Sequence, residues 1–220
     1  MSELILHGFP VSPYVRSARI ALFEKGVAYH FNEIGFDYLT TDAYTKLNPF
    51  RKMPVLQQEQ FVLYETPAIL SYIDEAFDGA SLQPAHPKAR AHMHKWFGIA
   101  AHYLYPVGVM QLFLQRVMSP ILGNQPDEAV VEAAVAAIAL PLDVLERELV
   151  DTFLVGDRLS LADILTGAMV YYVNMTQEGA TLIRSRPKTA TWLSQLSQRE
   201  SFQQSLAGLL QGKSMGGVEA

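Results

Sequence analysis

Three short segments carry residue types that suit the binding of a small anionic peptide. Ser12 and Thr66 each precede a proline, a pair that is typical of a helix start, where unpaired N–H groups attract anions. Pro54 opens an apolar run that has the pattern of a β-strand, and proline is confined to the first residue or the edge of a strand. We therefore expect the backbone of Met53 to be open to another extended chain. The Met53–Pro54 bond is also one whose cis form costs only about 0.5–1 kcal/mol.

These segments resemble the glutathione site of the cytosolic glutathione transferase family. The resemblance is carried by Ser-Pro-Tyr at 12–14, Lys-Met-Pro at 52–54 and Glu-Thr-Pro-Ala-Ile at 65–69. Residues 153–164, FLVGDRLSLADI, are similar to the hallmark of that family's helical domain. The four motifs occur in the family's order, and the match extends over most of the chain. The chain is identified as a member of bacterial type, with a serine at the thiol site.

The fold implied is an α/β thioredoxin-like N-terminal domain of order βαβαββα, followed by an all-α helical bundle. The expected limits are 1–78 for the first domain, 79–87 for a linker, 88–211 for the helical domain and 212–220 for a flexible tail. The patterns of the first domain predict strands at 4–7, 29–34, 55–56 and 61–63, and helices at 12–25, 35–50 (irregular) and 66–77.

In the helical domain, periodicity predicts five helices, at 88–118, 127–150, 160–174, 189–196 and 202–210. Pro106 is expected to kink the first of them. Ser160 and Asp163 have the spacing of a capping box, which is a folding signal.

Ser12 is the candidate for stabilising the glutathione thiolate. A free thiol has a pKa near 8.5, while a hydroxyl donating to a charged sulfur contributes about 1.5–3 kcal/mol and the helix dipole about 0.3–1 kcal/mol. Together these would lower the thiol pKa by about 1–3 units. Two alternatives stay open: Ser12 is a plain helix cap, or Tyr14 is the donor to the thiol.

The resemblance assigns four further residues to glutathione itself. The backbone of Met53 would pair with the cysteinyl unit, which leaves the Met53 side chain incidental. Thr66 would bind the γ-glutamyl carboxylate with its hydroxyl and N–H, and Glu65 would accept from the amino group. Lys52 would pair with the glycyl carboxylate, with a solvated surface lysine as the alternative.

Composition excludes several function classes. The chain of 220 residues has no cysteine, which rules out the cysteine-dependent reductases of this superfamily and fits a cytoplasmic protein without disulfides. Its net charge of −5 argues against a nucleic-acid partner. No apolar run approaches the ~18 residues of a membrane span, and no signal-peptide pattern opens the chain. The six histidines show no ligand-like pairing, so no metal is predicted.

The electrophile pocket is expected to use the long helix at 88–118. The candidates are aromatic residues and a methionine at helical spacing, a pattern that is also typical of a core. They are Tyr103, Tyr105, Met110 and Phe113, joined by Tyr171 and Tyr172.

The sequence thus predicts a homodimeric glutathione transferase with a role in detoxification. Glutathione, as cosubstrate, would attack a small hydrophobic electrophile in a cleft between the domains. One alternative is a glutathione-dependent isomerase or dehalogenase, although the Ser-Ser-Cys motif usual in the isomerases is absent. The other is a non-catalytic binding protein of the same fold; such proteins tend to lose the hydroxyl at the thiol site or the acid–hydroxyl pair, and this chain keeps both.

Overall fold

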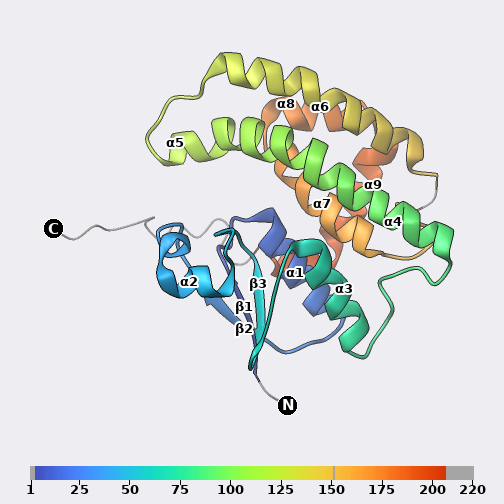
Figure 1. Cartoon of the computed structure of the whole chain (residues 1–220). Coiled ribbons are helices and arrows are strands. Elements are labelled where there is room, and N and C mark those ends of the chain that lie inside the picture. Colours follow the sequence, from blue (N-terminus) through green and yellow to red (C-terminus); the bar gives the residue numbers. More distant parts are fainter. Residues whose placement is uncertain (1–2, 151, 207–220) are drawn as a thin grey trace. The chain divides into compact units, whose positions relative to one another are not determined.

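The computed structural model describes residues 3–150 and 152–206, which divide into two compact units (Figure 1). The first unit holds the described residues up to Ala80 and those from Arg199 onward, and the second holds Ser81–Gln198. The predicted thioredoxin-like order βαβαββα and the helical second part are both confirmed. The predicted tail at 212–220 lies outside the described residues.

A four-stranded mixed sheet forms the centre of the first unit, in the order β2-β1-β3-β4. Strand β1 pairs in parallel with β2, while β3 runs antiparallel to both β1 and β4. The strands are β1 (Leu4–Gly8), β2 (His30–Glu33), β3 (Val55–Gln58) and β4 (Phe61–Tyr64). Strand β3 therefore lies inside the sheet, with Pro54 just before its first residue, where no ladder hydrogen bond is required of it.

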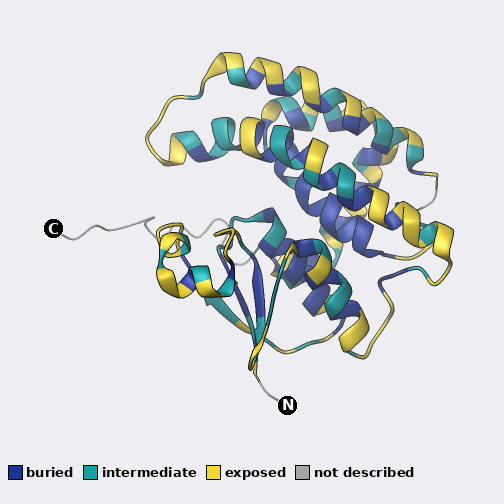
Figure 2. Ribbon diagram, in the orientation of Figure 1, coloured by how far each residue is buried: buried dark blue, intermediate teal, exposed yellow. Residues whose placement is uncertain are grey.

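Both faces of this sheet are covered because its strands are apolar on both sides. Leu6 and Leu56 are fully buried on the face where α1 (Pro13–Glu24) packs with α3 (Thr66–Ala76). On the other face, Val55 packs with the fully buried Tyr44 of the short helix α2 (Asp42–Leu47). In Figure 2 most of α1 is dark blue, the colour of buried residues, whereas α2 is mostly yellow and teal because Tyr44 is its one buried residue. The irregular helix expected at 35–50 is α2 preceded by one 3₁₀ turn, η1 (Tyr38–Thr40).

The last described helix, α10 (Glu200–Gln204), packs against α1 and so belongs to the first unit. Arg16 of α1 is fully buried, and its side chain donates to the hydroxyl of Ser205 at 3.0 Å and to the carbonyl of Phe202 at 3.3 Å. At the other end of α1, Arg199 forms a two-point ion pair with Glu24 at 2.8 Å. Although burial opposes it, hydrogen bonds from Arg199 and Ser201 lower the pKa of Glu24. These bonds explain why the residues from 199 onward group with the sheet rather than with the helices that precede them.

A buried lysine joins α1, α3 and the chain that leaves α3. The Lys25 ammonium donates to the carboxylate of Asp74 at 3.3 Å, to the Asp74 carbonyl at 3.0 Å and to the Ala80 carbonyl at 3.3 Å. The two side chains are only 3% and 4% exposed. Because three acceptors match the three N–H donors of the ammonium, its charge is buried without an unmet hydrogen bond.

The second unit is entirely helical in its described residues. Its helices are α4 (Pro87–Ile99), η2 (Ala100–Met118), α5 (Ser119–Ile121), α6 (Glu128–Glu148), α7 (Leu161–Asn174), α8 (Gln177–Arg184) and α9 (Pro187–Gln198). The long helix predicted at 88–118 is present as α4 and η2, but η2 has π-helical hydrogen bonds and contains Pro106. Proline removes one N–H from a helix and displaces the carbonyl four residues earlier, which favours a wider turn.

The buried carboxylate of Asp163 organises the start of α7. It accepts from the N–H of Leu154 at 2.8 Å, from the N–H and hydroxyl of Ser160 at 3.0 and 2.7 Å, and from the Trp192 indole at 2.9 Å. Burial raises the pKa of Asp163 despite these four hydrogen bonds. The predicted capping box is confirmed, and it extends into the hydrogen bond with α9 that joins the hallmark segment to the end of the bundle.

The sequence reasoning missed helix α8. Its signals were present: the Thr176 hydroxyl caps it by accepting from Gly179 N–H at 3.0 Å, with Glu178 in the first turn and Arg184 in the last. These are ordinary start and stop signals. They were missed because the helix has only eight residues.

One helical stretch among the described residues, Pro87–Ile121, is long and apolar enough to cross a membrane by length and composition alone. This stretch includes charged and polar residues, so it contains no uninterrupted apolar run of that length. In the structure it packs along α6 and α7.

The Lys25–Asp74 pair gives the first prediction. Lys25→Met should lower the free energy of unfolding by about 3–5 kcal/mol, because it leaves the Asp74 charge buried without a partner. Lys25→Met/Asp74→Leu should recover at least half of that loss. Urea unfolding measures both, with Lys95→Met as the control because the Lys95–Glu148 pair is much more exposed and exposed pairs contribute about 0–1 kcal/mol. A Lys25→Met loss no larger than that of the control would contradict the prediction.

Candidate functional site

The strand register brings the three predicted segments to one end of the sheet. His7 near the end of β1 lies opposite Val55 at the start of β3, and Val55 lies opposite Tyr64 at the end of β4. The chain after β1, the chain before β3 and the chain after β4 therefore meet at the same sheet end. Ser12, Lys52, Met53, Glu65 and Thr66 are all on these three segments.

Ser12 is the N-cap of α1. Its hydroxyl oxygen accepts from the N–H of Val15 at 3.4 Å, and its own N–H donates to the Phe9 carbonyl at 2.9 Å. A serine hydroxyl has one O–H to donate besides the lone pairs that accept. Ser12 can thus cap the helix and donate to a ligand at once, so the two roles weighed from the sequence are compatible.

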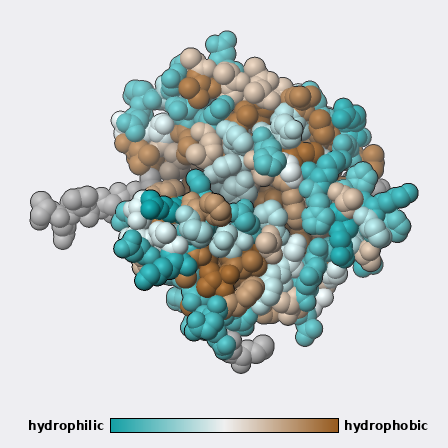
Figure 3. Space-filling model, viewed as in Figure 1, coloured by the Kyte–Doolittle hydropathy of each residue, from teal (hydrophilic) through white to brown (hydrophobic). Residues whose placement is uncertain are grey.

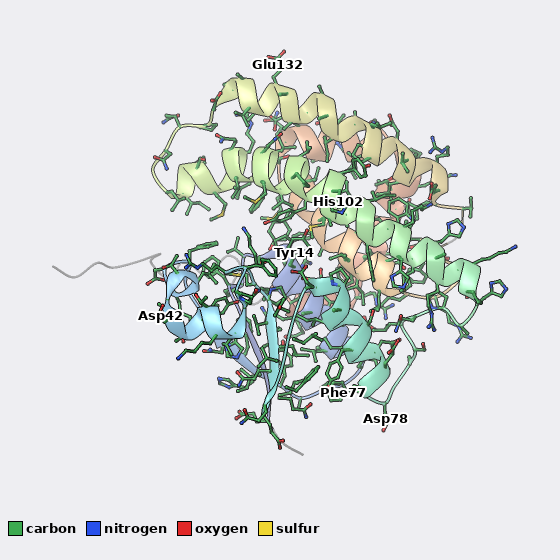
Figure 4. All side chains as sticks on the ribbon, viewed as in Figure 1. Tyr14, Asp42, Phe77, Asp78, His102 and Glu132 are labelled. Carbon is green, nitrogen blue, oxygen red and sulfur yellow. The ribbon has the colours of Figure 1, made fainter. Side chains whose placement is uncertain are left out.

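Tyr14 lies one residue inside the same helix, where Figure 4 labels it. Its side chain is half-buried. Ser12, in contrast, lies at the cap itself, where the unpaired N–H groups of the helix start are found. This difference favours Ser12 over Tyr14 as a donor to a bound anion.

The loop before β3 is held by two buried side chains that the sequence reasoning did not single out. Both the Tyr44 hydroxyl and the Asn48 amide donate to the carbonyl of Lys52 at 2.8 Å. Asn48 also accepts from the N–H of Phe50 at 3.0 Å. Burial raises the pKa of the Tyr44 phenol, which keeps it protonated as a donor. The Lys52 backbone is therefore fixed while its side chain is exposed.

Met53 has an unpaired backbone, and its side chain contacts the turn before α1. The Met53–Pro54 bond is cis, and in the part of the chain that the structure describes, neither the N–H nor the C=O of Met53 makes a hydrogen bond. The Met53 side chain, which was expected to be incidental to glutathione binding, has a contact within the protein: its Sδ accepts from the N–H of Phe9 at 3.1 Å. This contact joins the segment before β3 to the turn that ends in Ser12.

Glu65 and Thr66 form the start of α3, with a shift of one position from the prediction. Glu65, not Thr66, is the N-cap, and Thr66 is the first helical residue. Glu65 has φ 72° and ψ 109°, a combination that is strained for a residue with a Cβ and that occurs mainly at functional sites. Thr66 is 5% exposed, yet no hydrogen bond among the described residues uses its hydroxyl. Its hydroxyl and helix-start N–H together form an anion-binding pair.

The candidates for the electrophile pocket divide into two groups. Phe113 and Tyr172 are buried and stack edge-on, with ring centroids 4.7 Å apart, so they belong to the core of the helical unit. Tyr103 and Met110 are exposed, at 61% and 46%. The remaining two are half-buried: Tyr105 and Tyr171. The aromatic stripe is thus partly a packing feature.

Residues 3–150 and 152–206 contain no group of three histidine, aspartate or glutamate side chains placed to hold a metal ion. The polar groups gathered at the sheet end are a hydroxyl at each of two helix starts, an unpaired stretch of extended backbone, one exposed ammonium and one carboxylate. The chemistry of such a set suits a zwitterionic peptide and a developing anion.

Both units of the chain resemble known proteins. Residues 6–81 match the family model of the glutathione S-transferase N-terminal domain, and residues 107–200 match that of the C-terminal domain. Glutathione S-transferase 3 of Zea mays is 31% identical over 217 residues, covering 95% of this chain and 96% of the relative.

Solved structures are also similar. A theta-class glutathione S-transferase from the citrus canker pathogen Xanthomonas axonopodis pv. citri, with glutathione bound, has a TM-score of 0.83 at 27% identity and covers 98% of this chain and 100% of its own. Glutathione S-transferase I from maize, in complex with an atrazine–glutathione conjugate, has a TM-score of 0.84 at 26% identity, with coverages of 96% and 100%. With relatives from plants and from a bacterium, the bacterial-type subgroup expected from the sequence is not confirmed.

Proposed function

Because the chain belongs to the glutathione S-transferase family, we propose that it binds glutathione at the sheet end formed by residues 9–12, 52–54 and 65–66. The protein is a glutathione transferase, and glutathione is its cosubstrate. The observation that carries the proposed site is the register of β3 between β1 and β4, which gathers two helix starts and the open Met53 backbone.

Ser12 is the residue that activates the thiol. Its O–H donates to the glutathione sulfur while its oxygen keeps the cap of α1, and both the hydrogen bond and the helix start favour the thiolate over the thiol. Ser12 acts as a donor to an anion and not as a base, so the thiol proton leaves to solvent. This is a serine-type thiol site.

The peptide is held by its two ends and its middle. Thr66 binds the γ-glutamyl carboxylate with its hydroxyl and N–H, and Glu65 accepts from the neighbouring amino group. The Met53 N–H and C=O pair with the cysteinyl unit as one short step of β-sheet. Lys52, exposed on a fixed backbone, reaches the glycyl carboxylate.

The reaction is a transfer to sulfur. The thiolate forms a carbon–sulfur bond to a small hydrophobic electrophile, and the leaving group departs with the electron pair of the bond that breaks. The atrazine–glutathione conjugate bound by the maize relative is a product of this class. A detoxifying role follows from this chemistry.

Ser12→Ala tests the activation. It should raise the pKa of the bound glutathione thiol by about 1–2 units, since one hydrogen bond to the charged sulfur is lost, and lower kcat at pH 7 about ten- to a hundredfold. Calorimetry should find the Kd for glutathione within about threefold of wild type. Thiolate absorbance against pH, followed in the same samples, measures the thiol pKa.

The matched control for this experiment is Ser17→Ala on the same helix, where the hydroxyl donates to the Pro13 carbonyl at 2.9 Å. It should leave the bound thiol pKa unchanged, and so should Tyr14→Phe. If Tyr14→Phe removes the pKa shift while Ser12→Ala keeps it, Tyr14 is the donor and the assignment of Ser12 is wrong.

Thr66→Val tests the carboxylate site, because it keeps the side-chain shape and removes the hydroxyl. The Kd for glutathione should rise about tenfold or more, as expected for a hydrogen bond to a charged group, while the thiol pKa of the bound fraction stays that of wild type. Thr45→Val, on α2, is the control; its hydroxyl donates to the Thr41 carbonyl. Equal Kd values for Thr66→Val and wild type would show that the γ-glutamyl carboxylate does not bind at the Thr66 hydroxyl.

We propose that the protein acts as a homodimer. Support comes from the large apolar side chains that the first unit exposes, and Figure 3 shows apolar surface over its strands. The most exposed is Phe50 at 65%, and exposed apolar patches mark interaction sites. Light scattering on a sizing column should give twice the chain mass of 24.5 kDa. A monomer at micromolar concentration would contradict the proposal.

We also propose a cytoplasmic location without nucleic-acid or membrane partners. The absence of cysteine and the net charge of −5 support it, because disulfides mark oxidising compartments and a negative charge repels nucleic acid. The packing of Pro87–Ile121 against α6 and α7 gives that apolar stretch a place inside the helical unit.

A further inference from the structure

The turn that carries Ser12 is fixed at three points. The first point is Gly8, at the start of the turn. Its carbonyl accepts from Ile34 N–H at 3.0 Å, and a Cβ at this position would lie 2.4 Å from Cγ2 of Val15. The Phe9 ring packs on Phe36, with centroids 5.0 Å apart. The third point is the hydrogen bond from Phe9 N–H to Sδ of Met53.

The third point leads directly to Ser12. The backbone of Phe9 makes two hydrogen bonds: its N–H donates to the Met53 sulfur at 3.1 Å, and its carbonyl accepts from the Ser12 N–H at 2.9 Å. Among the described residues, Phe9 N–H has no other acceptor. A backbone donor in a half-buried turn requires an acceptor, and here a methionine side chain supplies it.

We infer that Met53 is a positioning residue for the reaction. Its thioether holds the turn of residues 9–12, so that the Ser12 hydroxyl is aimed at the glutathione sulfur. This inference rests on the proposed function of Ser12. The main chain of Met53 holds the cysteinyl unit and its side chain holds the turn that ends in the thiol donor, so one residue sets the position of both partners. Loss of the sulfur acceptor frees the turn without touching the groups that bind the peptide.

Met53→Leu is the test, since leucine keeps the apolar bulk and has no acceptor. The pKa of the bound thiol should rise by about 0.5–1 unit, and kcat at pH 6.5 should fall about three- to tenfold, with KM for glutathione within about twofold. The deficit should disappear at about pH 9.5, where the thiolate forms without assistance. Met53→Gln returns an acceptor of similar reach and should restore the wild-type profile.

Two further variants make the result unambiguous. Met118→Leu, in the helical unit, controls for a methionine loss in general and should leave the profile unchanged. Ser12→Ala, measured in parallel, reports on the proposed function: if it leaves the thiol pKa unchanged, the role of Ser12 fails. If Ser12→Ala shifts the pKa but Met53→Leu matches wild type, or raises only KM, the positioning role of Met53 is overturned and the role of Ser12 stands.

Discussion

The antiparallel register of β3 is the constraint on which the site depends. With Val55 opposite both His7 and Tyr64, three segments that are far apart in sequence must end at one place, and no side chain has to be long to reach it. A slip of one residue would turn every β3 side chain to the opposite face, so Leu56 and Val55 would each leave the neighbours against which they are buried. The packing of the sheet core therefore fixes the site as strictly as it fixes the fold.

The site is built mostly from backbone, and buried side chains hold that backbone in place. Tyr44 and Asn48 fix the Lys52 carbonyl, and Arg16 anchors the first helix to the end of the described chain. Glu65 keeps a strained conformation at the start of α3. Such strain persists only where the surrounding structure over-determines it, which is the state of a segment between a paired strand and a packed helix.

The sequence predicted the order of elements, the sheet and the two helix starts, because proline, glycine and apolar spacing act locally. It did not predict the Met53–Phe9 contact or the packing of α10 on α1. These depend on hydrogen bonds between residues that are 44 and 186 positions apart in the sequence. Helix α8 was overlooked because its few residues give a weak periodic signal.

A chain without cysteine can contribute no thiol chemistry of its own, and this determines what its site must do. The only nucleophilic sulfur is the ligand's, so the protein's task is to make that sulfur anionic and to keep it in place. A hydroxyl donor is sufficient to stabilise the anionic sulfur, provided that the hydroxyl stays in position, because a hydrogen bond weakens steeply with angle and distance. In the proposed mechanism, the rigidity of the turn at 9–12 is then part of the chemistry, because this turn holds the Ser12 hydroxyl in place.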